Sequence, residues 1–98
     1  RPLLEVQSPD ALRRFVDELL GTLLSYAQSR DTPLLETLEA LSAARWVRRA
    51  AARNLGIHIN SMSYRVERIQ TLTGLQLDDP ETRVAISIAL RARTMLGM

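Results

Sequence analysis

The residues of this chain whose types and spacing suit chemistry lie between positions 45 and 68. This segment holds six arginines and one acidic residue, Glu67, so its formal charge is +5, whereas the whole 98-residue chain carries +2. Arginine presents a planar fork of N–H donors that fits phosphate oxygens, and a clustered positive charge favours an anionic partner. The expected phosphate-contacting residues are Arg45, Arg48, Arg49, Arg53, Arg65 and Arg68.

Between these arginines lies a run of mostly small or hydrogen-bonding side chains. An α-helix fits the major groove of DNA, where asparagine pairs with adenine, serine donates or accepts, and an aliphatic side chain meets the thymine methyl. Phosphate contacts set affinity, and base contacts set sequence preference. The segment therefore predicts duplex DNA as the partner. The expected base contacts are His58, Ile59, Asn60, Ser61, Ser63 and Tyr64.

A helix-turn-helix over about residues 46–72 would position these side chains, with the helix at about 59–72 in the major groove. The two helices must cross closely, which favours small residues on the first and a glycine in the turn, where a positive φ costs glycine little. The predicted packing set is Ala51, Ala52, Leu55, Gly56, Ile57, Met62, Val66 and Ile69.

The rest of the chain also predicts helices. Seventeen leucines and eleven alanines, with few β-branched runs, indicate an all-α fold of about five helices. A capping residue precedes proline at Ser8-Pro9, Thr32-Pro33 and Asp79-Pro80, which is typical of helix starts. The expected helices are about 9–28, 33–41, 46–54, 59–72 and 80–96, and Gly74 is placed to end the fourth of them as a left-handed cap. We read 1–8 as a linker from a missing upstream domain and 9–98 as a single domain.

The last helix has a narrow polar stripe, which consists of Arg83, Ser87, Arg91 and Thr94. Apolar residues cover most of the remaining circumference: Val84, Ile86, Ile88, Ala89, Leu90, Ala92 and Met95. Such a helix is either central to the fold or half of a subunit interface. The first helix has one broad apolar face, which includes Ala27, and the first and last helices are our candidates for the contact of a homodimer. Three arginines of the last helix are expected on a solvated face: Arg83, Arg91 and Arg93.

Several function classes are disfavoured. The chain has no cysteine and one histidine, His58, without an acidic cluster at ligand spacing, so neither a metal site nor a disulfide is expected. There is no nucleophile–base pair or phosphate loop, so we expect no catalytic residue, no cofactor and no enzyme activity. No apolar run approaches the roughly eighteen residues of a membrane span, and a cytoplasmic protein is expected.

From Leu34 to Leu96 the sequence resembles the C-terminal domain of PucR-type bacterial regulators, which include purine-catabolism and sugar-diacid regulators. The resemblance rests on three ordered stretches. They are LLETL at 34–38, then His58, Asn60, Ser61, Tyr64, Arg65, Val66, Arg68 and Ile69, and then TGLQLDDP at 73–80. Ile59 departs from the pattern, which often has arginine there, so no base preference is carried over.

This resemblance implies a Fis-like helix-turn-helix with an N-terminal supporting helix and a C-terminal apolar helix. It also implies a transcription-factor output domain and an upstream sensor domain that binds a small-molecule effector. Dimerisation is expected, because one short helix reads few base pairs. The alternative is a helical dimerisation or protein-interaction module that does not bind nucleic acid.

Overall fold

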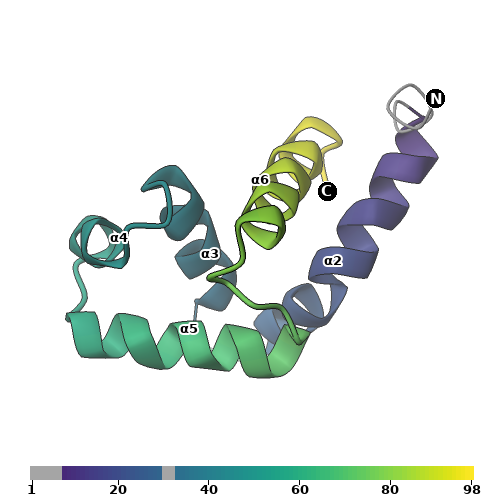
Figure 1. Cartoon of the computed structure of the whole chain (residues 1–98). Helices are drawn as coiled ribbons and strands as arrows, with labels where there is room; N and C mark the ends of the chain where they lie inside the picture. The colour runs from purple at the N-terminus through teal and green to yellow at the C-terminus, as the bar shows by residue number, and fades with distance from the viewer. Residues whose placement is uncertain (1–7, 30–32) are drawn as a thin grey trace.

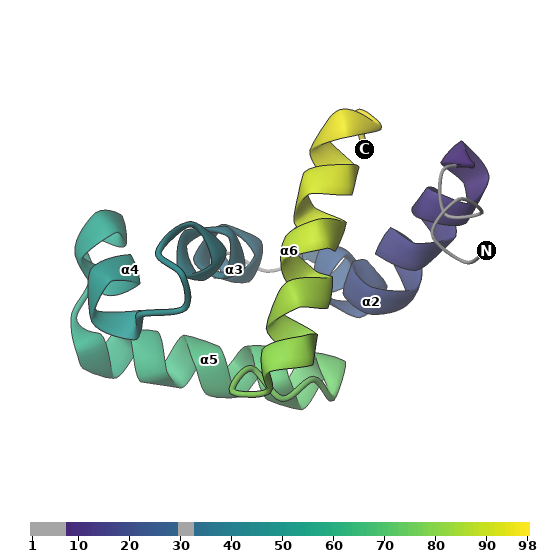
Figure 2. The ribbon, with the colours of Figure 1, turned by 45° about the horizontal axis from the view of Figure 1, so that its top comes forward.

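The computed structural model describes residues 8–29 and 33–98, and these form five α-helices and no strand. The all-α fold predicted from the sequence is therefore confirmed. α5 runs along the lower edge of the domain in Figure 1, and the chain turns back after it, so that α6 rises above α5 (Figures 1 and 2). The helices are α2 (Pro9–Ser29), α3 (Leu34–Ala43), α4 (Arg48–Leu55), α5 (Ile59–Thr73) and α6 (Pro80–Met95).

The hydrophobic core lies where α2, α3, α5 and α6 meet. α2 packs against both α5 and α6, and α3 packs against α4, α5 and α6. The apolar spacing of three and four along α2 places Val16, Leu20 and Leu23 fully inside. Leu34 and Leu38 of α3 are equally buried. The side chain of Ala27, predicted to face inward, lies outside the described part of the structure.

The predicted helix starts agree with the structure at two of three sites. The hydroxyl of Ser8 lies 3.5 Å from the Ala11 N–H, and Asp79 accepts hydrogen bonds from the N–H and the hydroxyl of Thr82 at 2.9 and 3.0 Å. The hydrogen bond from the Thr82 backbone lowers the pKa of Asp79, because it favours the carboxylate. α3 begins one residue later than predicted, after Pro33, and the predicted cap Thr32 lies outside the described residues.

Three helices end in a Schellman motif, in which an N–H donates to a carbonyl five residues earlier. The bonds run from Trp46 to Leu41, from Ile57 to Ala52 and from Met98 to Arg93. Glycine occupies the left-handed position in two of them, at Gly56 and Gly97, whereas Arg45 occupies it after α3 with φ of +56°. Gly74, predicted to end α5, also has a left-handed φ of +75°.

The predicted start of the third helix at Trp46 is wrong. Arg45 and Trp46 both have positive φ and form the turn that closes α3, so α4 begins only at Arg48. No sequence signal predicts this turn, because arginine and tryptophan rarely adopt a left-handed φ.

Of the two roles predicted for the last helix, burial on all sides within one copy does not hold, because Val84, Ile88 and Met95 are exposed. The polar side of α6 differs in part from its prediction. Ser87 instead faces α3, where its hydroxyl lies 2.8 Å from that of Ser42. Arg83, expected on a solvated face, is half-buried and donates through Nε to the Leu77 carbonyl at 2.7 Å, and Arg93 is also half-buried.

Candidate nucleic-acid interface

α4 and α5 pack together as a helix-turn-helix around a tight turn at Gly56. Ala51 and Ala52 are buried on α4, and their small side chains let α5 approach closely. Gly56 has φ of +70°, and Leu55 and Ile57 are half-buried on either side of it. Three residues of α5 are buried at spacings of four and three: Met62, Val66 and Ile69.

The first turn of α5 is capped by His58. Its Nδ1 accepts a hydrogen bond from the backbone N–H of Asn60 at 3.0 Å, which satisfies one of the unpaired donors at the helix start. The ring is exposed. His58 therefore fixes where α5 begins, and this places the side chains of the following turn.

One side of α5 is turned wholly to solvent. Asn60, Ser63, Tyr64 and Glu67 follow one another at spacings of three, one and three, so they share a helix face, and all four are exposed. Ile59 and Ser61 flank this face and are exposed as well. Within the described residues, no side-chain hydrogen bond engages Asn60, Ser61 or Ser63. We call Asn60, Ser63, Tyr64 and Glu67 the outer face of α5.

The six arginines of the basic segment fall into two groups. Three are exposed and have no hydrogen-bond or ion-pair partner in residues 8–29 and 33–98; we call them the free arginines, Arg45, Arg49 and Arg53. Three are half-buried and touch acceptors or rings elsewhere in the fold; we call them the held arginines, Arg48, Arg65 and Arg68.

Arg65 and Arg68 connect the inner side of α5 to the helices beneath it. Arg65 donates to the hydroxyl of the fully buried Thr37 at 3.0 Å. The guanidinium of Arg68 lies 3.5 Å from the Tyr26 hydroxyl and 5.7 Å from the centre of its ring. The hydrogen bond to Tyr26 raises the pKa of Arg68, because it favours the charged form. These contacts fix the orientation of α5 against α2 and α3.

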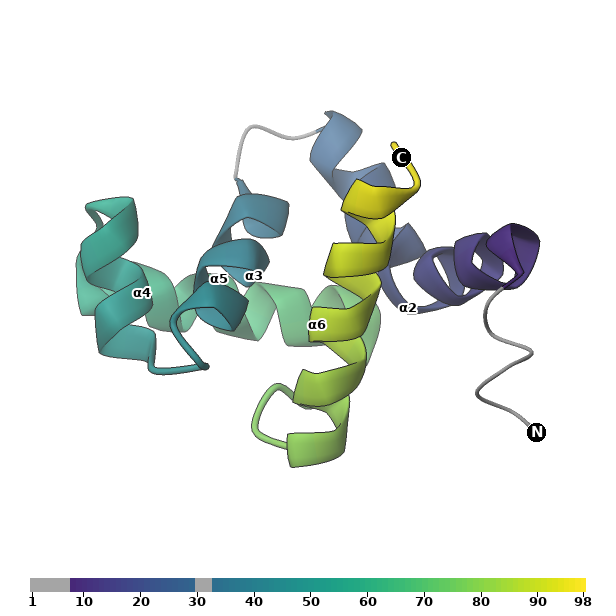
Figure 3. The same ribbon diagram turned by 90° about the horizontal axis from the view of Figure 1, so that it is seen from above.

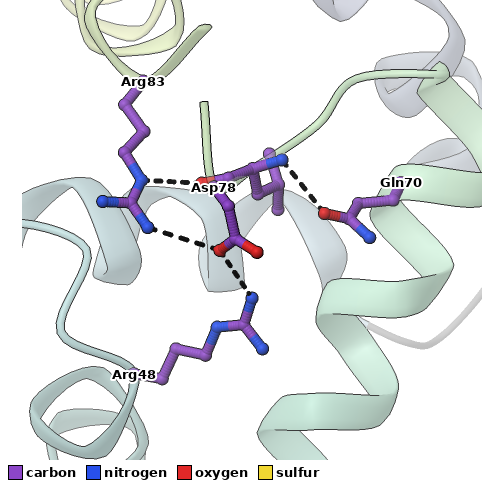
Figure 4. A network of polar contacts seen from close by, with 5 residues as sticks. Arg48, Gln70, Asp78 and Arg83 are labelled. Atoms are coloured by element: carbon purple, nitrogen blue, oxygen red, sulfur yellow. Dashed lines mark hydrogen bonds and ion pairs between the residues drawn. The ribbon is translucent and has the colours of Figure 1, made fainter. Parts of the chain in front are cut away.

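Arg48 is held by the connector between α5 and α6 (Figure 4). One Asp78 oxygen lies 3.2 Å from Nη2 of Arg48 and 3.5 Å from Nη2 of Arg83. The first turn of α4 contains two arginines and no acidic residue, an arrangement that the helix dipole disfavours. Asp78 supplies the missing negative charge from outside the helix.

The connector is itself held by α5. Gln70 of α5 accepts a hydrogen bond from the Leu77 N–H at 3.0 Å, and Leu77 is buried (Figure 4). Arg83 lies over the Trp46 ring at 5.7 Å, which ties the α3–α4 turn to the start of α6. The network therefore connects α4, α5 and α6 and holds the helix-turn-helix to the rest of the domain.

The comparison with known sequences decides the family. The profile of the PucR C-terminal helix-turn-helix domain matches residues 34–92. The chain belongs to this family. The resemblance inferred from the sequence is therefore confirmed, and with it the assignment to a family of helix-turn-helix domains of transcriptional regulators.

Three relatives were found among curated proteins. The chain is 31% identical over 97% of its length to the purine catabolism regulatory protein of Bacillus subtilis, of which it covers 18%. It is 38% identical over 92% of its length to an uncharacterised protein of Thermomonospora curvata, of which it covers 54%. It is 28% identical over 92% of its length to the proline-responsive transcriptional activator PutR of Bacillus subtilis, of which it covers 22%. No solved structure matches significantly.

Thus this PucR-family domain spans about half or less of the length of its curated relatives. In the described part of the chain, no group of three or more potential metal ligands comes together. No helix among these same residues is long and apolar enough to cross a membrane.

The structure also shows positioning residues that the sequence analysis did not single out. Gln70 and Tyr26 hold the connector and the inner side of α5, and Thr37 receives Arg65. Asp78 was not assigned a role of its own from the sequence. Its place in the TGLQLDDP stretch was the one available signal, since that stretch helps to carry the family match.

Proposed function

We propose that this domain binds duplex DNA as the output domain of a bacterial transcriptional regulator, with α5 in the major groove. The observation that carries the proposal is the polar, exposed outer face of α5, together with the exposed free arginines on α4 and on the turn before it. An inward-facing apolar side and two held arginines fix α5 from behind. Its outer face is therefore presented by a rigid support, as base recognition requires.

In this arrangement the first turns of α5 meet the base edges. We assign Asn60 to a bidentate contact with adenine and Ser61 and Ser63 to hydrogen bonds with bases. His58 and Ile59 lie at the helix start beside them, and Ile59, 38% exposed, is suited to a thymine methyl. Tyr64, 61% exposed, lies one turn further along and is suited to donate its hydroxyl to a base or a phosphate.

The free arginines are assigned to phosphates. Arg49 and Arg53 lie four residues apart on α4, so they share one side of that helix and are spaced to follow one strand. The unusual backbone of Arg45 supports a functional role, because an arginine in the left-handed position is strained where glycine would not be. Arg48, Arg65 and Arg68 would have to release protein partners before they could reach a phosphate.

The wider assignment follows from the family and the lengths of the relatives. We propose that the regulator acts in the cytoplasm as a dimer without catalytic activity. We also propose that a small-molecule effector binds an upstream sensor domain, with residues 1–8 joining that sensor to the helical domain over 9–98.

Salt dependence of duplex binding tests the proposal. A domain that neutralises phosphates loses affinity steeply as salt rises, with a log–log slope of about −0.9 per phosphate on B-DNA. Selection of preferred sites from random duplexes then supplies the target. Absence of duplex binding at low salt would contradict the proposal and favour a protein-interaction module.

Asn60→Ala tests the base assignment on the selected site. The expected loss is about 1–3 kcal/mol on that site, with little change on unrelated duplexes, because only the base contact is removed. An equal loss on every duplex would instead place Asn60 at a phosphate. Ser63→Ala on the same face should cost less on the selected site, since a serine hydroxyl has no bidentate geometry to lose.

A further inference from the structure

α6 has apolar side chains on two opposite sides, and residues 8–29 and 33–98 cover only one of them. Ile86, Ala89 and Leu90 are buried, whereas Val84, Ile88 and Met95 are 60%, 50% and 75% exposed. Aliphatic side chains exposed on successive turns of one helix form a patch that gains free energy when another surface covers it. Figure 3 shows α6 from the side on which few other segments cross it.

The exposed residues of this side follow a pairing pattern. Glu81, Val84, Ile88, Arg91 and Met95 succeed one another at alternating steps of three and four, and all are exposed. This is the spacing by which two helices pack along a common seam. We call these five residues the outer seam of α6.

The first four residues of the outer seam are self-complementary when the helix is reversed. Steps of three, four and three read the same from either end. In an antiparallel pair, Val84 of each copy would therefore meet Ile88 of the partner subunit, and Glu81 would meet Arg91 of the partner subunit. An apolar centre would be flanked by two pairs of opposite charge, which is the property of an interface with two-fold symmetry.

We propose that the outer seam binds a second copy of this chain, with the two α6 helices antiparallel about a two-fold axis midway between Val84 and Ile88. Charge complementarity identifies the occupant. Neither Glu81 nor Arg91 has an ion-pair partner in the part of the chain that the structure describes, and the reversed seam provides one for each. Antiparallel helices also align their dipoles favourably.

A groove beside the seam widens the apolar surface. It lies between the start of α2 and the C-terminal half of α6 and has a volume of about 370 Å³. Pro9 and Leu12 line it on one side, and Ile88, Ala92 and Met95 on the other. A second copy therefore meets apolar surface on both helices rather than a single narrow ridge.

The pairing rests on the proposed function for its biological meaning. α6 rises away from α5 (Figures 1 and 2). The outer seam and the outer face of α5 share no residue, so the proposed pairing is compatible with the proposed DNA binding. A two-fold axis makes the α5 helices of the two copies point in opposite directions along the duplex. The operator is then an inverted repeat rather than a direct repeat.

Charge reversal tests the pairing by sedimentation of the 98-residue chain without DNA. Glu81→Arg and Arg91→Glu each place two like-charged pairs in the homodimer, and each should weaken association by about tenfold. An equimolar mixture of the two variants restores both attractive pairs and should associate like the unaltered chain. Because both side chains are exposed, the two variants should fold normally, and circular dichroism checks this.

Ile88→Asp removes the apolar centre and should give a monomer at concentrations where the unaltered chain is dimeric. Val47→Asp is the matched control, since Val47 is 54% exposed but lies at the start of α4. The proposal is overturned by a chain that stays monomeric up to millimolar concentration, by Ile88→Asp that still dimerises, or by a mixture of charge variants that fails to associate.

These outcomes are separate from those of DNA binding. If the seam variants alter sedimentation but the chain binds no duplex, only the proposed function fails. If duplex binding persists while the seam variants leave sedimentation unchanged, only the pairing fails.

Discussion

The free and held arginines lie in one stretch of chain and differ in what surrounds their guanidinium groups. Arg49 and Arg53 project from α4 into solvent, whereas Arg65 and Arg68 project from α5 toward Thr37 and Tyr26. A held guanidinium has already exchanged water for protein contacts, and it would lose these on moving to a phosphate. A free guanidinium loses only water and rotamer freedom.

Under the proposed function, the two groups would serve one interface in different ways. The free arginines would supply attraction that depends on salt, and the held arginines would supply rigidity that depends much less on it, because their contacts are partly buried. On this hypothesis the segment charge of +5 overstates how many phosphates one domain neutralises. This division predicts that stability and DNA affinity respond oppositely to substitution in the two groups.

The largest expected effect belongs to the double variant Arg49→Ala/Arg53→Ala. Loss of two phosphate contacts should reduce the log–log salt slope by about 1.8 and weaken binding about sixtyfold near 0.1 M salt. Its free energy of unfolding should stay within about 0.5 kcal/mol, because both side chains are exposed. Fluorescence anisotropy at several salt concentrations and urea unfolding measure the two quantities. An unchanged salt slope would mean that the free arginines do not contact phosphates and that the two groups do not differ in this respect.

Arg65→Met should show the reverse behaviour. It removes a charged donor from the buried Thr37 hydroxyl, which should lower the free energy of unfolding by about 1–2 kcal/mol. The salt slope of the folded domain should not change. Arg53→Met is the matched control, since it removes the same charge from an exposed site. A slope that falls by about 0.9 in Arg65→Met would show that this arginine contacts a phosphate.

Arg45→Gly should separate stability from affinity at a single residue. Glycine adopts the left-handed φ without strain, so the variant should be more stable by about 0.5–1 kcal/mol. The same change should reduce the salt slope by about 0.9, because one phosphate contact is lost. Thermal unfolding and the salt titration measure both effects. A variant that gains stability and keeps its slope would remove Arg45 from the free arginines.

The sequence predicted those features that depend on neighbours in the chain. Gly56 and Gly74 end their helices as expected, and Asp79-Pro80 begins α6, because each signal lies within a few residues of its effect. α5 was predicted for the same reason. Its buried residues, such as Met62 and Val66, repeat at helical spacing, and this spacing distinguishes them from the residues of the outer face.

The features that the sequence did not predict depend on distant partners. Arg65 and Thr37 are 28 residues apart, and Arg68 and Tyr26 are 42 apart, so charge clustering alone could not divide the arginines. The turn at Arg45 and Trp46 was missed because neither residue favours a positive φ. The sequence left open whether α6 is central or half of an interface, because a helix that is apolar on most of its circumference does not reveal which side its own domain covers.

The smallest effect tests Arg48, which is the least firmly held of its group because Asp78 is 76% exposed. Asp78→Asn keeps the shape of the side chain but removes its charge, and should cost about 0.5 kcal/mol of stability, as for other exposed ion pairs. Asp10→Asn is the matched control, since Asp10 is 82% exposed and pairs with Arg13 on α2. DNA affinity should rise in Asp78→Asn alone, because Arg48 is released and a negative charge near α4 is lost. A fall in affinity would mean that Asp78 holds Arg48 in position for a phosphate. A held arginine could then also contact DNA.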